Sequence, residues 1–185
     1  MPMTEGIEQL AEQYHQLMIK LADEWVRYNL WTWQWWVNVG MLIIPWVLWV
    51  FIRDKKRTAR YLCVAFAMII ITSLLNIIGE SLGLWVYPYK LVPLIPPFFP
   101  WDFSVFPVAT MITIQFKPVS NPYGKGAAFA VMGAFIFEPV MVLLGLYKEK
   151  GWSHFYSLPM YFLIYLLAHY ISTWKTFDRI EHKRA

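Results

Sequence analysis

The chain has 185 residues and a net charge of +4, and 58% of its residues are hydrophobic while only 15% are charged. Soluble domains are nearer half apolar and a quarter charged. The apolar residues lie in runs long enough to cross a bilayer, so we expect no soluble enzyme and no separate soluble catalytic domain. The positive charges lie in short loops beside these runs, as membrane insertion requires, and they do not indicate a nucleic-acid partner.

Residues 4 to about 28 predict an amphipathic helix. Its apolar side chains share one face at helical spacing. They are Ile7, Leu10, Tyr14, Leu17, Met18, Leu21 and Trp25. The opposite face is polar and mainly acidic, which argues against tight binding to anionic lipid. Residues 1–33 are therefore expected to form an N-terminal interfacial helix, and they lack the continuous apolar core of a secretory signal peptide.

Five apolar runs predict an all-α fold, a polytopic transmembrane helix bundle of five spans. The runs cover residues 34–52, 61–79, 102–116, 126–147 and 157–174. Most are near the ~20 residues needed to cross ~30 Å of hydrocarbon, and the third is short. A backbone in lipid must bond to itself, so the spans are helices. The transmembrane domain is thus 34–174, followed by a basic tail at 175–185.

The basic residues predict the orientation in the membrane. The first loop and the tail are rich in Lys and Arg, and the third loop holds Lys117 and Lys125. The second loop holds only Lys90, and the fourth holds Lys148 and Lys150 with Glu149 between them. We therefore expect a multi-pass protein of the cell (cytoplasmic) membrane, with the N-terminus outside and the C-terminus in the cytoplasm. The tryptophans expected at the outer boundary are Trp31, Trp33, Trp35, Trp36, Trp85, Trp101 and Trp152.

The second loop is apolar and rich in proline from residue 91 to 100. Proline removes backbone donors and blocks helix continuation. This pattern favours an ordered interfacial lid over the outer helix ends, with a re-entrant segment as the alternative.

A weak internal repeat links the second and fourth spans. Asn76 precedes a Gly-Leu-Trp exit at residues 83–85, and Glu138 precedes a Gly-Leu-Tyr exit at 145–147. Each exit is followed by an outer loop and a returning helix with a proline near its start. Both halves run in the same direction, so the pattern predicts a parallel repeat.

Three acids are candidates for general acid and base chemistry: Glu138, Asp102 and Glu80. Glu138 lies deep in the fourth span, where it is expected to be uncharged or bonded to a donor such as Asn76 or a buried tyrosine. With Asn76, these acids would line an outward-facing cavity. Its expected aromatic walls are Trp85, Tyr87, Trp101, Tyr147, Trp152 and Tyr156.

A structural role is the alternative for each acid. Glu80 and Asp102 suit an interfacial position, with Asp102 capping its helix, and Glu138 suits a hydrogen bond between helices. No metal or cofactor is expected, because Glu80, Asp102, Glu138 and His154 share no i, i+3 or i, i+4 spacing. No nucleotide, zinc-protease or serine-hydrolase motif is present.

The stretch from about Asn76 to Tyr161 resembles a family of small, uncharacterised multi-pass membrane proteins of endospore-forming bacteria. The residues that carry the resemblance are 83–87 (Gly-Leu-Trp-Val-Tyr), 101–105 (Trp-Asp-Phe-Ser-Val), 138–139 (Glu-Pro), 145–147 (Gly-Leu-Tyr) and 156–159 (Tyr-Ser-Leu-Pro). A more distant likeness is to membrane-embedded terpene and lycopene cyclases. Their paired glutamates after proline are replaced here by Pro100-Trp101-Asp102.

Four functions follow as hypotheses. The first is a membrane protein whose pocket holds a lipid or other amphiphile. The second, implied by the cyclase likeness, is an enzyme that protonates an isoprenoid. The third is a transporter or channel, which would require a homo-oligomer because five helices make a small pathway. A structural or assembly role is a fourth. Membrane lipids are the expected partners in all of them.

Overall fold

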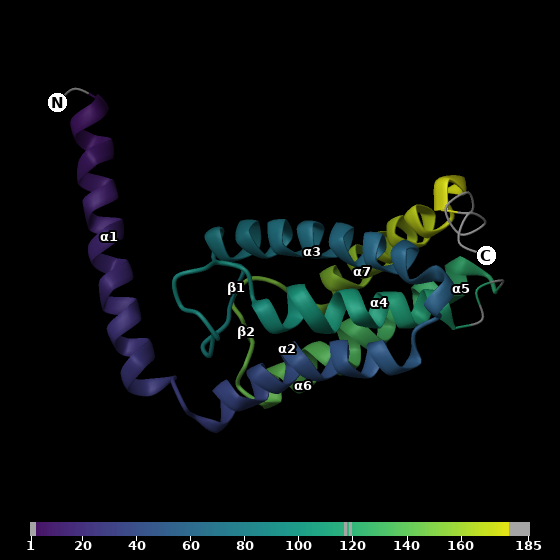
Figure 1. Cartoon of the computed structure of the whole chain (residues 1–185). Coiled ribbons are helices and arrows are strands. Elements are labelled where there is room, and N and C mark those ends of the chain that lie inside the picture. Colours follow the sequence, from purple (N-terminus) through teal and green to yellow (C-terminus); the bar gives the residue numbers. More distant parts are fainter. Residues whose placement is uncertain (1–2, 117, 119, 178–185) are drawn as a thin grey trace.

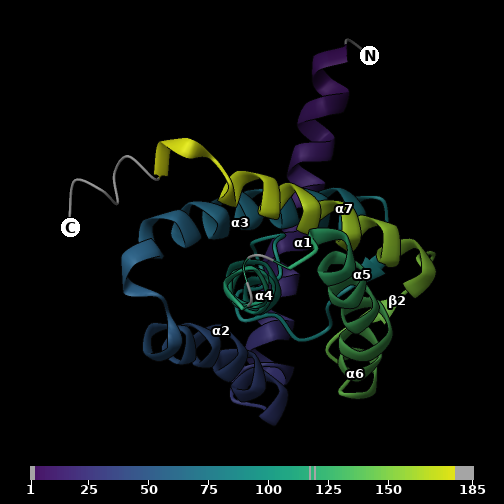
Figure 2. The ribbon, with the colours of Figure 1, turned by 90° about the vertical axis from the view of Figure 1, so that its right-hand side faces the viewer.

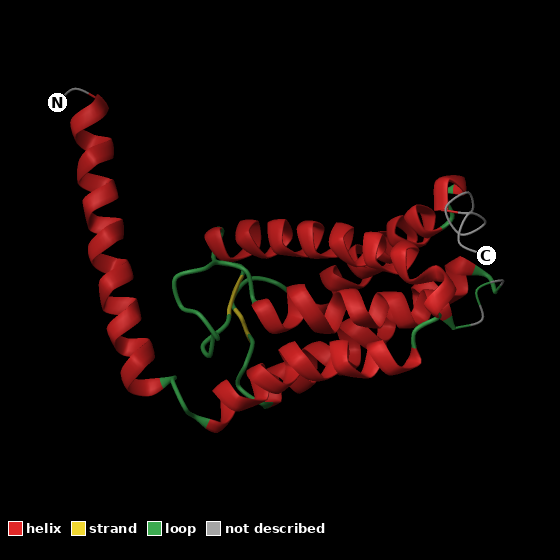
Figure 3. Cartoon of the chain, in the orientation of Figure 1, coloured by secondary structure: helices red, strands yellow, loops and turns green. Residues whose placement is uncertain are grey.

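The computed structural model describes residues 3–116, 118 and 120–177 and has an all-α fold (Figures 1 and 3). The helices are α1 (Met3–Tyr28), α2 (Trp33–Ile52), α3 (Thr58–Ser81), α4 (Phe106–Gln115), α5 (Pro122–Met132), α6 (Glu138–Leu143) and α7 (His154–Ser172). A short 3-10 turn, η1 (Lys55–Arg57), precedes α3. The π-helical segments η2 (Trp101–Val105) and η3 (Gly133–Phe137) lead directly into α4 and α6. Strands β1 (Trp85–Val86) and β2 (Lys148–Glu149) form one small sheet.

Four helices are long and apolar enough to cross a membrane, among the described residues. They span Trp33–Ile52, Lys55–Ser81, Pro122–Leu143 and His154–Phe177. These match four of the five expected spans. The expected third span corresponds to η2 and α4, a shorter helix over residues 101–115. Most of the basic tail at 175–185 lies outside the described residues.

The short helix α4 lies at the centre of the bundle, with α2, α3, α7 and α5 around it (Figure 2). Its buried side chains include Phe106, Val108, Met111 and Ile114, and they pack against α3 and α7 in the main apolar core. A central helix is shielded by its neighbours, so its length need not match the full hydrocarbon thickness.

The fourth span ends four residues earlier than the sequence predicted, at Leu143 rather than Tyr147. Gly145 has a φ of +72°, a left-handed conformation that ends helices. The α3 helix ends in the same way at Gly83, with a φ of +68°. At both helix ends the glycine N–H donates to the carbonyl three residues earlier. The N–H of the next residue donates to the carbonyl five residues earlier.

The strands that follow these two exits pair with each other. Val86 lies opposite Lys148, and Trp85 lies opposite Glu149, in an antiparallel arrangement. Val86 and Lys148 each lie three residues beyond the helix-ending glycine, so the pairing is centred on corresponding positions. The parallel repeat itself stays a prediction.

Proline shapes the entry to the central helix. Pro107 has no N–H, so the carbonyl of Phe103, four residues earlier, lacks its helical donor. The indole Nε1 of Trp46 on α2 donates to that carbonyl at 2.8 Å. Immediately before this point the helix is π-helical, with the Phe106 N–H bonded to the carbonyl of Trp101.

Helix α1 runs across the bundle axis at one end of the molecule (Figure 1). The indole Nε1 of Trp25, on this helix, donates to the carbonyl of Lys90 at 2.7 Å. Next to it, the amide of Asn29 donates to the carbonyl of Pro88 at 3.3 Å. The apolar stripe beyond this attachment, from Ile7 to Leu17, is exposed.

The proline-rich loop contains no helix between residues 87 and 98, so a re-entrant helix is not formed there. Its second half packs down, with Phe98 buried against Tyr147. Its tip is open, since Val92, Leu94 and Ile95 are exposed. The lid expected from the sequence is therefore only partly packed against the helices.

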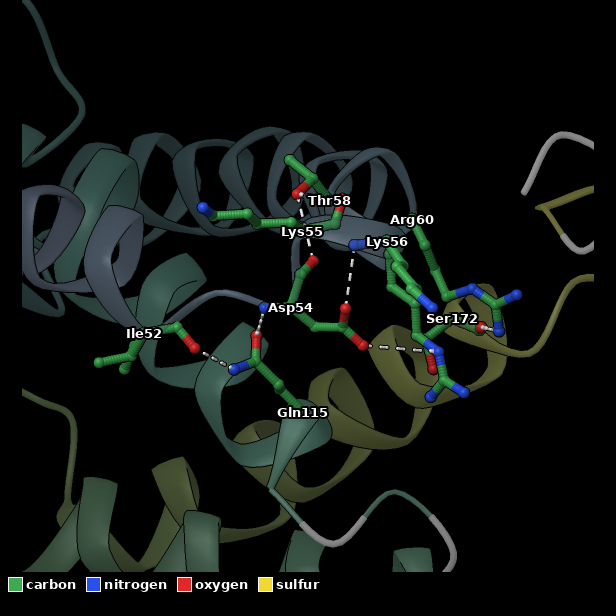
Figure 4. Close-up of polar contacts among 9 residues, drawn as sticks. Ile52, Asp54, Lys55, Lys56, Thr58, Arg60, Gln115 and Ser172 are labelled. Atoms are coloured by element: carbon green, nitrogen blue, oxygen red, sulfur yellow. Dashed lines mark hydrogen bonds and ion pairs between the residues drawn. The ribbon is translucent and has the colours of Figure 1, made fainter. Parts of the chain in front are cut away.

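The opposite end of the bundle is closed by a polar junction (Figure 4). Gln115 at the end of α4 donates to the carbonyl of Ile52 at 2.7 Å and accepts from the backbone N–H of Asp54 at 3.3 Å. Arg60 on α3 donates to the carbonyl of Ser172 at 3.1 Å, at the end of α7. These bonds join the ends of α2, α3, α4 and α7 beside the most basic loop.

Candidate functional site

A cavity of about 310 Å³ lies between the C-terminal half of α3 and the N-terminal half of α7, with α6 and the β1 strand around it. Its wall is mostly apolar and aromatic. The lining residues are Thr72, Leu75, Asn76, Ile78, Gly79, Leu82, Leu84, Trp85, Tyr87, Trp101, Glu138, Met141, Tyr147, Trp152, Ser157, Met160, Tyr161 and Ile164. Since Ile78 and Leu82 are exposed on α3, the cavity reaches the surface of the bundle.

Asn76 is the first polar centre of this cavity. Its amide nitrogen donates to Asp102 Oδ1 at 2.6 Å. Its amide oxygen accepts from Trp85 Nε1 at 3.1 Å and from the Tyr87 hydroxyl at 2.8 Å. One side chain thus ties α3 to η2 and holds two aromatic rings of the wall in place.

Asp102 lies behind Asn76, fully buried and outside the cavity lining. Its second oxygen, Oδ2, accepts from the backbone N–H of Phe98 at 3.0 Å, at the start of the helix that contains η2. Burial, reinforced by the nearby Asp102, raises the pKa of Tyr87 well above its usual value. Tyr87 therefore keeps its proton and remains a donor to Asn76.

Glu138 is the second polar centre, and it lies in the cavity wall. Tyr161 on α7 donates to its Oε1 at 2.5 Å. Its Oε2 lies 2.7 Å from His154 Nδ1. The expected pairing with a buried tyrosine is confirmed, whereas the expected pairing with Asn76 is wrong, because the amide of Asn76 is engaged by Asp102, Trp85 and Tyr87.

Two glycines allow the aromatic rings to approach the helices. A Cβ placed on Gly79 would lie 2.0 Å from the ring of Trp85. A Cβ on Gly133, in η3, would lie 2.7 Å from the ring of Tyr161. The first contact seats a ring that bonds Asn76, and the second seats the ring that bonds Glu138.

Most of the residues predicted from the sequence meet at this cavity. Asn76, Trp85, Tyr87, Trp101, Glu138, Tyr147 and Trp152 line it. Asp102, Glu80 and Tyr156 do not line it. Glu80 forms an ion pair with Lys90 at 2.6 Å, which also holds Pro96 of the loop. Tyr156 is exposed and packs edge-on against Trp152.

Sequence reasoning missed three polar residues around the cavity, Glu149, Ser157 and Tyr161, and it considered His154 only as a metal ligand, which it set aside. Ser157 accepts from Trp152 Nε1 at 2.8 Å, and His154 lies 2.9 Å from Glu149 Oε1. A signal was present for Tyr161, since it lies seven residues after His154 and therefore on the same face of a helix. Glu149 had no such signal, because only the strand pairing brings it to the site.

The chain was compared with family models, with curated proteins and with solved structures. No match was found in any of the three comparisons.

Proposed function

We propose that this is a five-span integral membrane protein whose outward-facing cavity binds a lipid or other amphiphile. The observation that carries the proposal is the cavity of about 310 Å³, which has an apolar, aromatic wall and two polar centres, Asn76 and Glu138. Ligand pockets of roughly 300 Å³ and above commonly combine such a wall with few, well-placed polar groups. An amphiphile suits both parts of this surface.

The entrance of the cavity supports a ligand that arrives from the bilayer. Ile78 and Leu82 lie on the outer half of α3, where an apolar surface would face lipid rather than water. An acyl or isoprenoid chain could enter between α3 and α7 without crossing the aqueous phase. The polar end would then meet Asn76 or Glu138.

The position of α1 supports the proposed orientation. Trp25, which attaches α1 to the Lys90 loop, belongs to the apolar stripe of the helix. The stripe therefore faces the side of α1 on which the bundle lies. In a membrane, this is the side of the lipid, so α1 would rest on the outer surface with its polar face in water.

Lysine and arginine define the other side. The loop from Arg53 to Arg60 lies at the end of the bundle opposite α1, together with the end of α4 and the start of α5 (Figure 1). With this end in the cytoplasm, the protein obeys the positive-inside rule. The cavity, which lies at the α1 end, then opens toward the outer leaflet.

The proposal is tested by identifying lipids that remain bound to the purified protein, using native mass spectrometry. Leu75→Trp fills the cavity, because Leu75 lines it, whereas Leu74→Trp places the same ring on the exposed face of the same helix. We expect the wild type and Leu74→Trp to retain one amphiphile and Leu75→Trp to lose it. Equal retention by the two variants, with both folded, would count against the cavity as the binding site.

A further inference from the structure

Three donor side chains from different elements meet beside the cavity: Glu138 of α6, Glu149 of β2 and His154 of α7. One oxygen of each carboxylate and one imidazole nitrogen all lie within 4.8 Å of one another. The oxygens Glu138 Oε2 and Glu149 Oε1 both approach the same atom, His154 Nδ1, at 2.7 and 2.9 Å. The chain separations are too long for a helical motif, so only the fold assembles this group.

Protein hydrogen bonds do not satisfy this group. His154 Nδ1 carries at most one proton, and its hydrogen bond goes to Glu138 Oε2. Glu149 Oε1 is buried and has no hydrogen-bond partner among the described residues. Two carboxyl oxygens therefore converge on one nitrogen, and one of them is left without a hydrogen bond. A cation between the three atoms would bind all of them.

We propose that Glu138, Glu149 and His154 bind a divalent transition-metal ion such as Zn²⁺. Two carboxylates and an imidazole are a ligand set that suits zinc, and three protein ligands leave a fourth position open. Metal–ligand bonds of about 2.0–2.2 Å would place tetrahedral donor atoms roughly 3.3–3.6 Å apart. His154 Nδ1 lies closer than this to each oxygen, at 2.7 and 2.9 Å, and the three atoms all lie within 4.8 Å of one another, so small side-chain rotations create the site.

The Glu138 carboxyl group is held in place by an outer hydrogen bond, as metal ligands commonly are. Tyr161 donates to Glu138 Oε1, which fixes the carboxylate and leaves Oε2 directed at His154. Such outer hydrogen bonds orient ligands, and losing one typically weakens metal binding by about 10–100-fold. Metal binding requires His154 Nδ1 without its proton, so binding releases a proton when the imidazole is protonated. Tyr161 is a positioning residue in this scheme.

The metal site and the amphiphile cavity share Glu138, but binding at each can be tested separately. Glu149 and His154 do not line the cavity, so loss of metal binding in their variants does not test amphiphile binding. Both are also partly exposed, with side-chain exposures of 32% and 25%, which gives an ion access from the outer surface.

The test is to titrate the purified, chelator-treated full chain with ZnCl₂ in a calorimeter and to measure the bound metal by metal analysis. We expect one Zn²⁺ per chain in the wild type, with at least about tenfold weaker binding in Glu149→Gln and in His154→Gln, and 10–100-fold weaker binding in Tyr161→Phe. Glu80→Gln is the matched control, since Glu80 is also an outer carboxylate but pairs with Lys90. Ca²⁺ and Mg²⁺, which prefer all-oxygen sites, should not compete.

Folding is checked separately by thermal unfolding in metal-free buffer. Glu149 lies in a short, partly exposed strand, so the Glu149→Gln variant should unfold at the wild-type temperature. Zn²⁺ should raise the unfolding temperature of the wild type and Glu80→Gln but not of Glu149→Gln. Binding in Glu149→Gln equal to that of the wild type, or no stoichiometric binding by the wild type, would overturn the proposal.

Discussion

Asn76 on α3 and Asp102 on η2 are joined by a hydrogen bond of 2.6 Å that connects two helices inside the protein. Because Asn76 also accepts from Trp85 and Tyr87, this pair fixes the rings that form the wall of the cavity. The geometry of the cavity therefore depends on one amide.

Replacing Asn76 by leucine should strongly destabilise the fold. The change leaves Asp102 Oδ1, the Trp85 indole and the Tyr87 hydroxyl without their partner, and each buried unsatisfied group costs about 1–3 kcal/mol. Tyr87→Phe removes only one of these bonds and should cost about 1 kcal/mol. Thermal unfolding in detergent measures both. Equal losses for the two variants would show that the network is not shared through Asn76.

Much of this fold follows from hydrophobic runs. The sequence predicted all five bundle helices and the helix over residues 4–28, because apolar length and helical spacing are local properties. It also predicted that Glu138 would be uncharged or bonded to a donor such as Asn76 or a buried tyrosine. It could not predict that Asn76 bonds Asp102 rather than Glu138, because that choice depends on how α3 packs against η2. Glu149 was missed for a similar reason, since the β1–β2 pairing that places it at the site joins residues far apart in the chain.

Two substitutions of Glu138 distinguish a structural role of this residue from a chemical one. Glu138→Gln keeps an acceptor for Tyr161, so it should cost no more than about 1–2 kcal/mol, whereas Glu138→Leu leaves the Tyr161 hydroxyl unsatisfied and should cost more. Retained lipid, measured by native mass spectrometry, should fall in both variants if the carboxyl group contacts the ligand. If Gln keeps both folding and ligand while Leu harms only folding, Glu138 is a packing hydrogen bond.

Gly79→Ala should disrupt the cavity without changing its polar groups. The added Cβ would lie 2.0 Å from the Trp85 ring, so the ring must move and release its hydrogen bond to Asn76. Gly124→Ala is the control, because a Cβ there meets no atom within 4 Å. We expect a lower unfolding temperature and weaker amphiphile retention for Gly79→Ala alone. Identical behaviour of the two variants would contradict the close packing of Trp85 on α3.

The orientation is tested by reporter fusions. A reporter inserted in the loop from Arg53 to Arg60, and another after Arg184, should both report the cytoplasm, since the basic residues are retained on that side. A reporter at the N-terminus, before α1, should report the outside. An external signal from the Arg53–Arg60 loop would reverse the proposed topology and would place the cavity on the inner side.

The hydrogen bond from Trp46 to the carbonyl of Phe103 implies that the effects of Trp46→Phe and Pro107→Ala are coupled. Trp46→Phe keeps an aromatic ring on α2 but removes the donor at 2.8 Å, and it leaves a carbonyl without a partner because Pro107 has no N–H. We expect a loss of about 1–3 kcal/mol in the free energy of unfolding.

Pro107→Ala supplies the missing N–H four residues after Phe103 and so restores a helical donor to the same carbonyl. In that background Trp46→Phe should cost less, because the carbonyl no longer depends on the indole. A double-mutant cycle measured by unfolding in detergent gives the coupling, which we expect to be about 0.5–3 kcal/mol, as for other pairs that share a partner. Full additivity would mean that the indole stabilises the bundle only by packing, and that the carbonyl of Phe103 finds another donor when Trp46 is absent.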